Sequence, residues 1–130
     1  MQIVSVHHIG IRVTDEKRAV EFYERFGFQL VYRDRVDPVV ILKNGHGVEL
    51  NLVVNAAQPF DGKNRLMDVP EKFPGYTHVA LRVPSIEDAR AFVLGLGVTI
   101  TDGPKQLGAG MSLFLRDPDA NVIELRQDFA

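Results

Sequence analysis

Two histidine–glutamate pairs carry most of the chemistry that this sequence offers: His8 with Glu49, and His78 with Glu124. Together they form a donor set of two imidazole nitrogens and two carboxylates, which suits one divalent ion per site, of Ni, Zn, Co, Mn or Fe. Four protein ligands on an octahedral ion leave two adjacent positions for water or for two substrate oxygens. Such an ion acts as a Lewis acid, and a neighbouring carboxylate can serve as general base for a C–H proton.

The two pairs lie in two copies of one segment. Residues 8–30 align with residues 78–100 at a constant offset of 70 and without a gap. The matched residues are His8 with His78, Arg12 with Arg82, Val13 with Val83, Ala19 with Ala89, Phe22 with Phe92 and Gly27 with Gly97. Further on, Val48-Glu49-Leu50 resembles Ile123-Glu124-Leu125. Any one of the four ligand candidates alone is typical of a solvent-facing strand position. Their recurrence predicts a pseudo-symmetric metal site with Glu49 and Glu124 at matching points.

The same duplication predicts the fold. Residues 8–13 alternate as a half-buried strand, Thr14-Asp15 can cap a helix that ends at Gly27, and strands are predicted at 29–34, 39–43 and 48–54. The second copy repeats this order with strands at 77–83, 98–101, 111–116 and 122–126 and a helix at about 85–94. The fold class is therefore α+β: two paired βαβββ modules forming a curled mixed sheet with helices outside. We expect one domain over 1–130, with module one at about 5–54, a linker or lid at about 55–75 and module two at about 76–127.

Composition excludes several classes of function. The formal net charge of −2 gives no electrostatic case for nucleic acid, and the absence of cysteine excludes disulfides, thiolate metal sites and a cysteine nucleophile. No signal peptide is evident, and no apolar run approaches the ~20 residues of a membrane span. We therefore expect a cytoplasmic protein without a membrane partner.

Several motifs resemble one known family, the vicinal oxygen chelate superfamily of glyoxalases, bleomycin resistance proteins and dioxygenases. They are the segments 8–13 (HIGIRV), 22–23 (FY), 47–50 (GVEL), 78–83 (HVALRV) and 117–125 (DPDANVIEL). The full His/Glu/His/Glu set most resembles glyoxalase I (lactoylglutathione lyase). That resemblance implies a metal-dependent lyase or isomerase acting on the hemithioacetal of a 2-oxoaldehyde with glutathione or another thiol. It also implies Glu124 as the leading proton-transfer base, Glu49 as its partner, and a homodimer.

Two basic residues are candidates for substrate binding. Arg12 lies ~13 Å along the strand from His8, too far to be a ligand but suitable for a remote substrate carboxylate, as the resemblance to glyoxalase I also implies. Lys105 is predicted in a mobile loop where it could meet an anionic group. His7 is one residue out of the ligand alternation, and a packed histidine is predicted there.

The sequence departs from glyoxalase I after Glu49. Val53 stands where an asparagine that helps to hold glutathione is expected, and the chain has no tryptophan. The thiol is therefore open. Three alternatives to the lyase function also stay open: a related metal-dependent epimerase, a dioxygenase, and a metal-free small-molecule binding protein of the bleomycin-resistance type.

Overall fold

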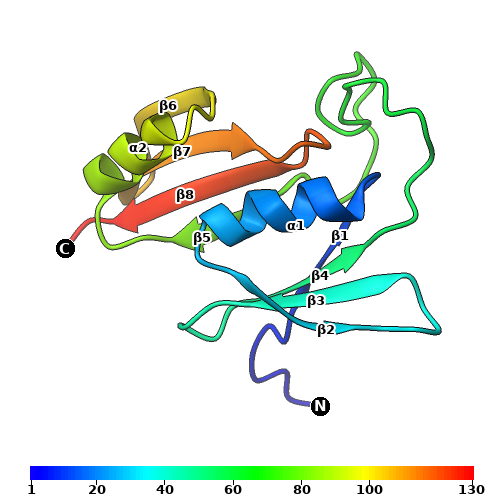
Figure 1. Ribbon diagram of the computed structural model, residues 1–130. Helices are drawn as coiled ribbons and strands as arrows, with labels where there is room; N and C mark the ends of the chain where they lie inside the picture. The colour runs from blue at the N-terminus through cyan, green and yellow to red at the C-terminus, as the bar shows by residue number, and fades with distance from the viewer. The chain divides into compact units, whose positions relative to one another are not determined.

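The structure is a computed structural model that describes residues 1–130, and it contains two helices and eight strands (Figure 1). In chain order these are β1 (Ile9–Arg12), α1 (Glu16–Arg25), β2 (Gln29–Arg33), β3 (Val39–Lys43), β4 (Glu49–Val53), β5 (His78–Arg82), α2 (Ile86–Gly95), β6 (Ile100–Leu107), β7 (Gly110–Arg116) and β8 (Val122–Asp128). The strands form two four-stranded sheets, in the orders β1-β4-β3-β2 and β5-β8-β7-β6. The two predicted βαβββ modules are confirmed.

Each module follows one plan. Its first strand pairs in parallel with its last strand, and the remaining pairings are antiparallel. The helices begin at capped positions: the Asp15 side chain accepts a hydrogen bond from the backbone N–H of Arg18, and Ser85 accepts one from Asp88. These N-caps allow the backbone of each module to pass from its first strand into its helix within a few residues.

Alternation along the central strands separates a buried face from a half-buried face. In module one the buried face carries Val40, Leu42, Leu50 and Leu52, which are at most 1% exposed. The half-buried face of β4 presents Glu49, Asn51 and Val53 in turn. Because side chains alternate with a period of two, these three point to the same side of the sheet. That half-buried face is where the candidate site residues of module one lie.

The chain divides into two compact units, residues 1–61 and residues 62–130. The segment predicted as a linker or lid, 55–75, is shared between them. Its first part is tied to unit one, since the Gln58 amide donates to the backbone carbonyl of Thr14. Its second part is tied to unit two, where Asn64 donates to the carbonyl of Ala120 and Asp68 pairs with Arg116. The segment is therefore held by hydrogen bonds on both sides of the unit boundary.

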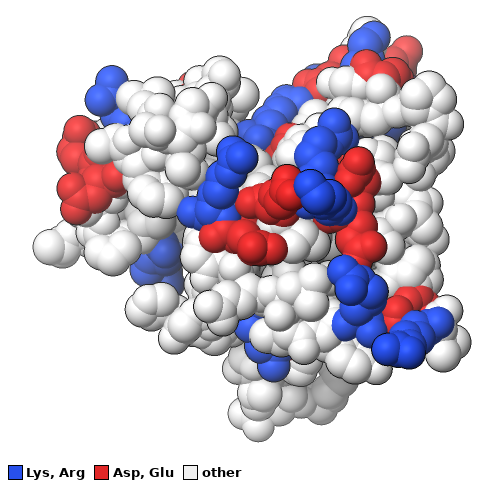
Figure 2. All heavy atoms as spheres, viewed as in Figure 1, with Lys and Arg blue, Asp and Glu red and all other residues white.

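Charge on the surface is mixed in sign. Figure 2 shows Lys and Arg side chains interspersed with Asp and Glu over α1, with no broad field of one sign on this face. The exposed side of that helix also carries an i,i+4 ion pair, Lys17 with Glu21 at 2.7 Å. Neither helix is long and apolar enough to span a bilayer.

Candidate functional site

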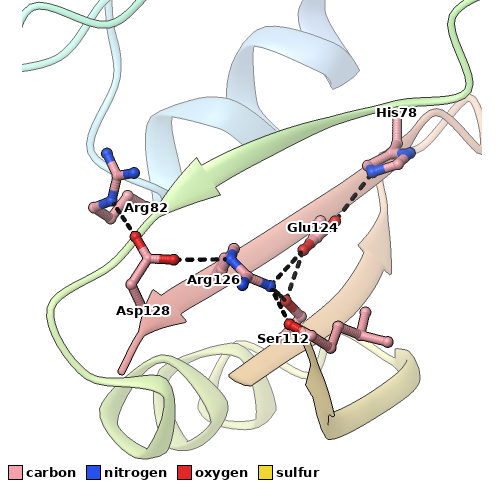
Figure 3. A network of polar contacts seen from close by, with 7 residues as sticks. His78, Arg82, Ser112, Glu124, Arg126 and Asp128 are labelled. Carbon is pink, nitrogen blue, oxygen red and sulfur yellow. Dashed lines mark hydrogen bonds and ion pairs between the residues drawn. The ribbon is translucent and has the colours of Figure 1, made fainter. Parts of the chain in front are cut away.

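In module two, His78 and Glu124 meet directly. His78 begins β5 and Glu124 lies in the middle of β8, and the imidazole Nε2 is 3.0 Å from the carboxylate Oε1. The other oxygen, Oε2, accepts a hydrogen bond of 2.6 Å from the hydroxyl of Ser112, a fully buried residue of β7. Glu124 is itself only 7% exposed. Figure 3 shows the His78 and Glu124 side chains pointing toward one another along the face of the sheet. One oxygen of Glu124 is thus fixed by the framework while the other faces the imidazole.

A charged chain continues from this pair toward the other end of β8. Arg126 Nη1 lies 3.9 Å from Glu124 Oε2 and donates to the hydroxyl of Ser112 at 3.3 Å. Its Nε donates to Asp128, which also accepts from Arg82 Nε at 3.0 Å (Figure 3). The hydrogen bonds from Arg82 and Arg126 hold the pKa of Asp128 below its usual value. Arg126 therefore links the Glu124 carboxylate to Asp128 and Arg82, and it also contacts Ser112, the residue that donates a hydrogen bond to Glu124.

In module one, His8 and Glu49 lie at the same end of a strand pair. Their successors Ile9 and Leu50 are register partners in the parallel β1–β4 ladder, so the two residues enter the sheet side by side. The closest basic groups to the Glu49 carboxylate are Lys43 Nζ at 3.5 Å and His7 Nδ1 at 3.9 Å. His7 is exposed rather than packed, because it precedes β1 and is not bound by strand alternation. The donor atoms of His7, His8 and Glu49 all lie within 4.8 Å of one another.

Strand pairing corrects the expected equivalence of Glu49 and Glu124. Asn51 faces Gly10 across β1–β4 and Ile41 across β3–β4. Glu124 faces Ala80 and Phe114 in the corresponding places of module two. Since Gly10 and Ala80 are matched by the offset of 70, Asn51 is the structural counterpart of Glu124. The resemblance between Val48-Glu49-Leu50 and Ile123-Glu124-Leu125 is two residues out of register.

The hairpin before the last strand shows why. Residues 39–53 superimpose in pairing on residues 112–126 at an offset of 73 (41 to 114, 51 to 124). In both turns one side-chain oxygen caps two backbone N–H groups: Asn44 caps His46 and Val48, and Asp117 caps Asp119 and Asn121. Both turns then pass through a positive φ, +83° at Gly47 and +60° at Ala120. The recurrence of this turn, Asn44 with Asp117, was the signal in the sequence that gives the correct offset.

The counterpart of Glu124 sits in a different environment. The Oδ1 atom of Asn51 is buried and has no hydrogen-bond partner. The cross-strand pair Ser112–Arg126 of module two corresponds to Val39–Val53 in module one. Module one therefore lacks the hydroxyl and the guanidinium that lie beside Glu124, and the buried acceptor of Asn51 has no hydrogen-bond partner in the protein. The sequence analysis overlooked Asn51, Ser112 and Arg126.

Comparison with known proteins agrees with the fold and the motifs. Residues 5–125 match the family described as the Glyoxalase/Bleomycin resistance protein/Dioxygenase superfamily. The chain belongs to this superfamily. A curated relative, the virulence protein STM3117 of Salmonella typhimurium, is 27% identical, with 98% of this chain and 86% of the relative covered. Among solved structures, the antibiotic binding protein TnmS3 of Streptomyces sp. CB03234 is 28% identical with a TM-score of 0.72, covering 98% of each chain. A glyoxalase/dioxygenase of Nostoc punctiforme, at 22% identity, has the same fold with a TM-score of 0.73 over 97% of this chain and 92% of that one.

The two predicted substrate-binding residues of this superfamily member are both engaged. Arg12, the last residue of β1, donates from Nε to Asn55 at 3.2 Å. Lys105 lies within β6, not in a mobile loop, and its Nζ is 2.6 Å from Asp102 Oδ2. The strand predicted to end near residue 101 continues through two register irregularities to Leu107, which places Lys105 on a hairpin edge. Each cation therefore already has a protein partner, a neutral amide for Arg12 and a carboxylate for Lys105.

Proposed function

We propose that this superfamily member is a divalent-metal-dependent lyase or isomerase of the glyoxalase type. The observation that carries the proposal is the His78–Glu124 pair. Two donors bound to adjacent positions of one ion at ~2.1 Å lie about 3 Å apart, which is the separation of Nε2 and Oε1. Ser112 holds the second carboxylate oxygen in the way that outer-shell donors orient metal ligands. His78, Glu124, His8 and Glu49 are the residues that would hold the ion.

Bound there, the ion would supply Lewis-acid polarisation of a chelated pair of substrate oxygens. The residues of this chain would do the rest. With Oε1 released from the ion, Glu124 would take a proton at that oxygen from the carbon beside the chelated oxygens and return it to the neighbouring carbon. Ser112 would keep Oε2 in place during that transfer. His78, whose Nε2 lies 3.0 Å from Oε1, would hold that oxygen in place, so that the substrate approaches Glu124 from one side only.

The remaining parts of the proposal concern the ligand and its surroundings. The substrate would be a small organic molecule, such as a hemithioacetal of a 2-oxoaldehyde with glutathione or another thiol. Arg12 and Lys105 would meet an anionic group at its far end. A homodimer and a cytoplasmic location stay predictions.

A turnover assay tests the proposal. Protein reconstituted with Ni, Co, Zn or Mn is incubated with the methylglyoxal hemithioacetal of glutathione and of a second thiol. We expect turnover, and we expect Glu124→Gln to reduce kcat by about 100-fold or more, as removal of a general base does. His46→Ala, an exposed turn histidine, is the matched control and should retain activity. Metal-loaded protein that turns over neither substrate would contradict the lyase proposal.

A second function, binding of a small molecule without chemistry, is favoured by Asn51. At the place where module two carries a carboxylate, module one carries a neutral amide with an unpaired oxygen. Such an atom accepts a hydrogen bond from a ligand N–H or O–H, and the relative TnmS3 is named as an antibiotic binding protein. Equilibrium binding of bleomycin and of a panel of other antibiotics to metal-free protein tests this function. Asn51→Leu should weaken that binding by about 10-fold, the effect of one lost hydrogen bond to ligand.

A further inference from the structure

The first module contains a compact group of donors that the second module lacks. His7 and His8 place their Nδ1 atoms 2.9 Å apart, and His7 Nδ1 lies 3.9 Å from Glu49 Oε2. All three donor atoms fall within 4.8 Å of one another. We propose that module one is by itself a divalent-cation site, in which His7, His8 and Glu49 bind one ion without any residue of module two.

The distances fit one ion. At metal–nitrogen and metal–oxygen bonds of about 2.0–2.2 Å, adjacent ligands are about 3 Å apart and opposite ligands about 4.2 Å apart. The separation of the two imidazole nitrogens matches adjacent ligands, and the carboxylate lies between the two limits. The rings stand nearly perpendicular, at 87°, with their Nδ1 atoms facing each other. Two facing imidazole nitrogens repel unless a proton or a cation lies between them, and a metal ion would take the place of a shared proton here.

The backbone explains how three donors from two segments converge. The parallel ladder makes Ile9 and Leu50 partners, which brings the residues before them, His8 and Glu49, to the same end of the strand pair. The chain before Ile9 is not in a strand, so His7 is free of alternation and its side chain can turn to the same side. Two histidines and one carboxylate on one face of an ion leave its other positions open for water or a ligand. This donor set suits Fe, Co, Ni or Zn.

One nearby group opposes the cation. Lys43 Nζ lies 3.5 Å from Glu49 Oε1, the oxygen that does not face His7. The lysine is exposed, so its charge is screened by solvent and it can withdraw when an ion binds. Its removal should therefore strengthen metal binding several-fold.

The inference goes beyond the proposed function: where that proposal places one ion on residues of both modules, the inference gives module one an ion of its own, held by His7, His8 and Glu49. It rests on the metal dependence proposed above and does not require turnover. Titration of untagged full-length protein with Ni²⁺ by calorimetry, and with Co²⁺ by visible absorption, gives the number of ions and their affinity. We expect His7→Ala to weaken binding at this site by more than about 10-fold. Glu49→Gln and His8→Ala should do the same, and His46→Ala should change nothing.

The decisive variant is the double substitution His78→Ala with Glu124→Gln. We expect it to retain one bound ion with an affinity within about threefold of the same site in the unchanged protein. Loss of all binding in this variant would overturn the inference, as would wild-type affinity in His7→Ala. Circular dichroism of each variant separates loss of a ligand from loss of the fold. Failure of the lyase assay with the ion bound would contradict only the proposed function, because the inference is read from binding.

Discussion

The two sheets have the same topology but differ in how many protein groups contact their acidic side chains. In module two, Glu124 is tied by a buried serine and a histidine and lies near Arg126. In module one, Glu49 is the first residue of β4 and has only a lysine and a histidine at ion-pair distance. The interior position that matches Glu124 carries Asn51, with an unpaired oxygen. Duplication thus preserved the backbone and the turn, while the polar groups on the half-buried face diverged.

The largest difference should come from leucine at the two matching positions. Glu124→Leu leaves the buried hydroxyl of Ser112 without its acceptor and removes a partner of His78, so we expect the free energy of unfolding to fall by about 2–4 kcal/mol. Asn51→Leu removes an unsatisfied buried oxygen, so the free energy of unfolding should stay the same or rise by up to about 1 kcal/mol. Urea denaturation measures both. Equal losses in the two variants would show that the two positions are held alike.

The serine that holds Glu124 should show a smaller effect. Ser112→Ala removes a fully buried hydroxyl that donates to Glu124 and accepts from Arg126, and we expect a loss of about 2 kcal/mol. Its counterpart Val39 is the matched control. Val39→Thr adds a hydroxyl to the face that carries Asn51, and we expect a change below about 1 kcal/mol, because that face offers an unpaired acceptor. A loss in Val39→Thr as large as that in Ser112→Ala would argue against the difference between the modules.

The shared turn offers a reciprocal test of about 1 kcal/mol. Gly47→Ala puts a side chain at a φ of +83°, which is costly for residues other than glycine, and the free energy of unfolding should fall by about 1 kcal/mol. Ala120→Gly relieves the same conformation at +60°, and this relief should equal or exceed the extra chain entropy that glycine gives the unfolded state, so the free energy of unfolding should change by between zero and a gain of about 1 kcal/mol. Thermal unfolding of both proteins gives the two signs. A gain in Gly47→Ala would mean that the two turns are not equivalent.

The smallest effect concerns acid stability. Arg116, the counterpart of Lys43, makes a bidentate pair with Asp68, and its hydrogen bonds, with the backbone N–H of Asn64, hold the pKa of Asp68 below 3.8. A carboxylate with a lowered folded pKa contributes stability that is complete above the unfolded value and is lost as pH falls through the folded value. We expect Asp68→Asn to remove this part of the acid sensitivity, which is at most about 1 kcal/mol at a partly exposed site. Melting temperatures from about pH 6 to about pH 2.5 measure it. An unchanged slope below the ordinary aspartate pKa would contradict it.

The fold could be predicted from the sequence because its signals are local and repeated. Alternation in 8–13 and 78–83, the caps Asp15 and Ser85, and the glycine after the first helix each act within a few residues. The matching of Glu49 with Glu124 failed because it used three apolar–acid–apolar residues, a pattern that any half-buried strand produces. The correct offset depends on a turn whose two copies share chemistry and not identity, Asn44 with Asp117 and Gly47 with Ala120.

The roles of other site residues could not be predicted from the sequence pattern. Ser112 matters because it lies diagonally across a strand pair from Glu124, and Lys105 is engaged because β6 continues past its bulges to Leu107. His7 turns toward Glu49 because its segment precedes the strand. Each of these depends on pairing between segments far apart in the chain. The four-residue metal set of His8, Glu49, His78 and Glu124 stays a prediction.

The capped turn also limits how module one can change. The Glu49 side chain could occupy the place of Asn51 only if β4 shifted by two residues relative to both of its neighbours, β1 and β3. The Asn44 carboxamide and the positive φ at Gly47 fix the length of the hairpin, and a slide would break those hydrogen bonds together with the ladder. An acid at that position can therefore be gained only by substitution at residue 51 itself. The turn thus fixes the register of β4, and any variant of this chain that keeps the turn also keeps Glu49 and Asn51 at their separate positions.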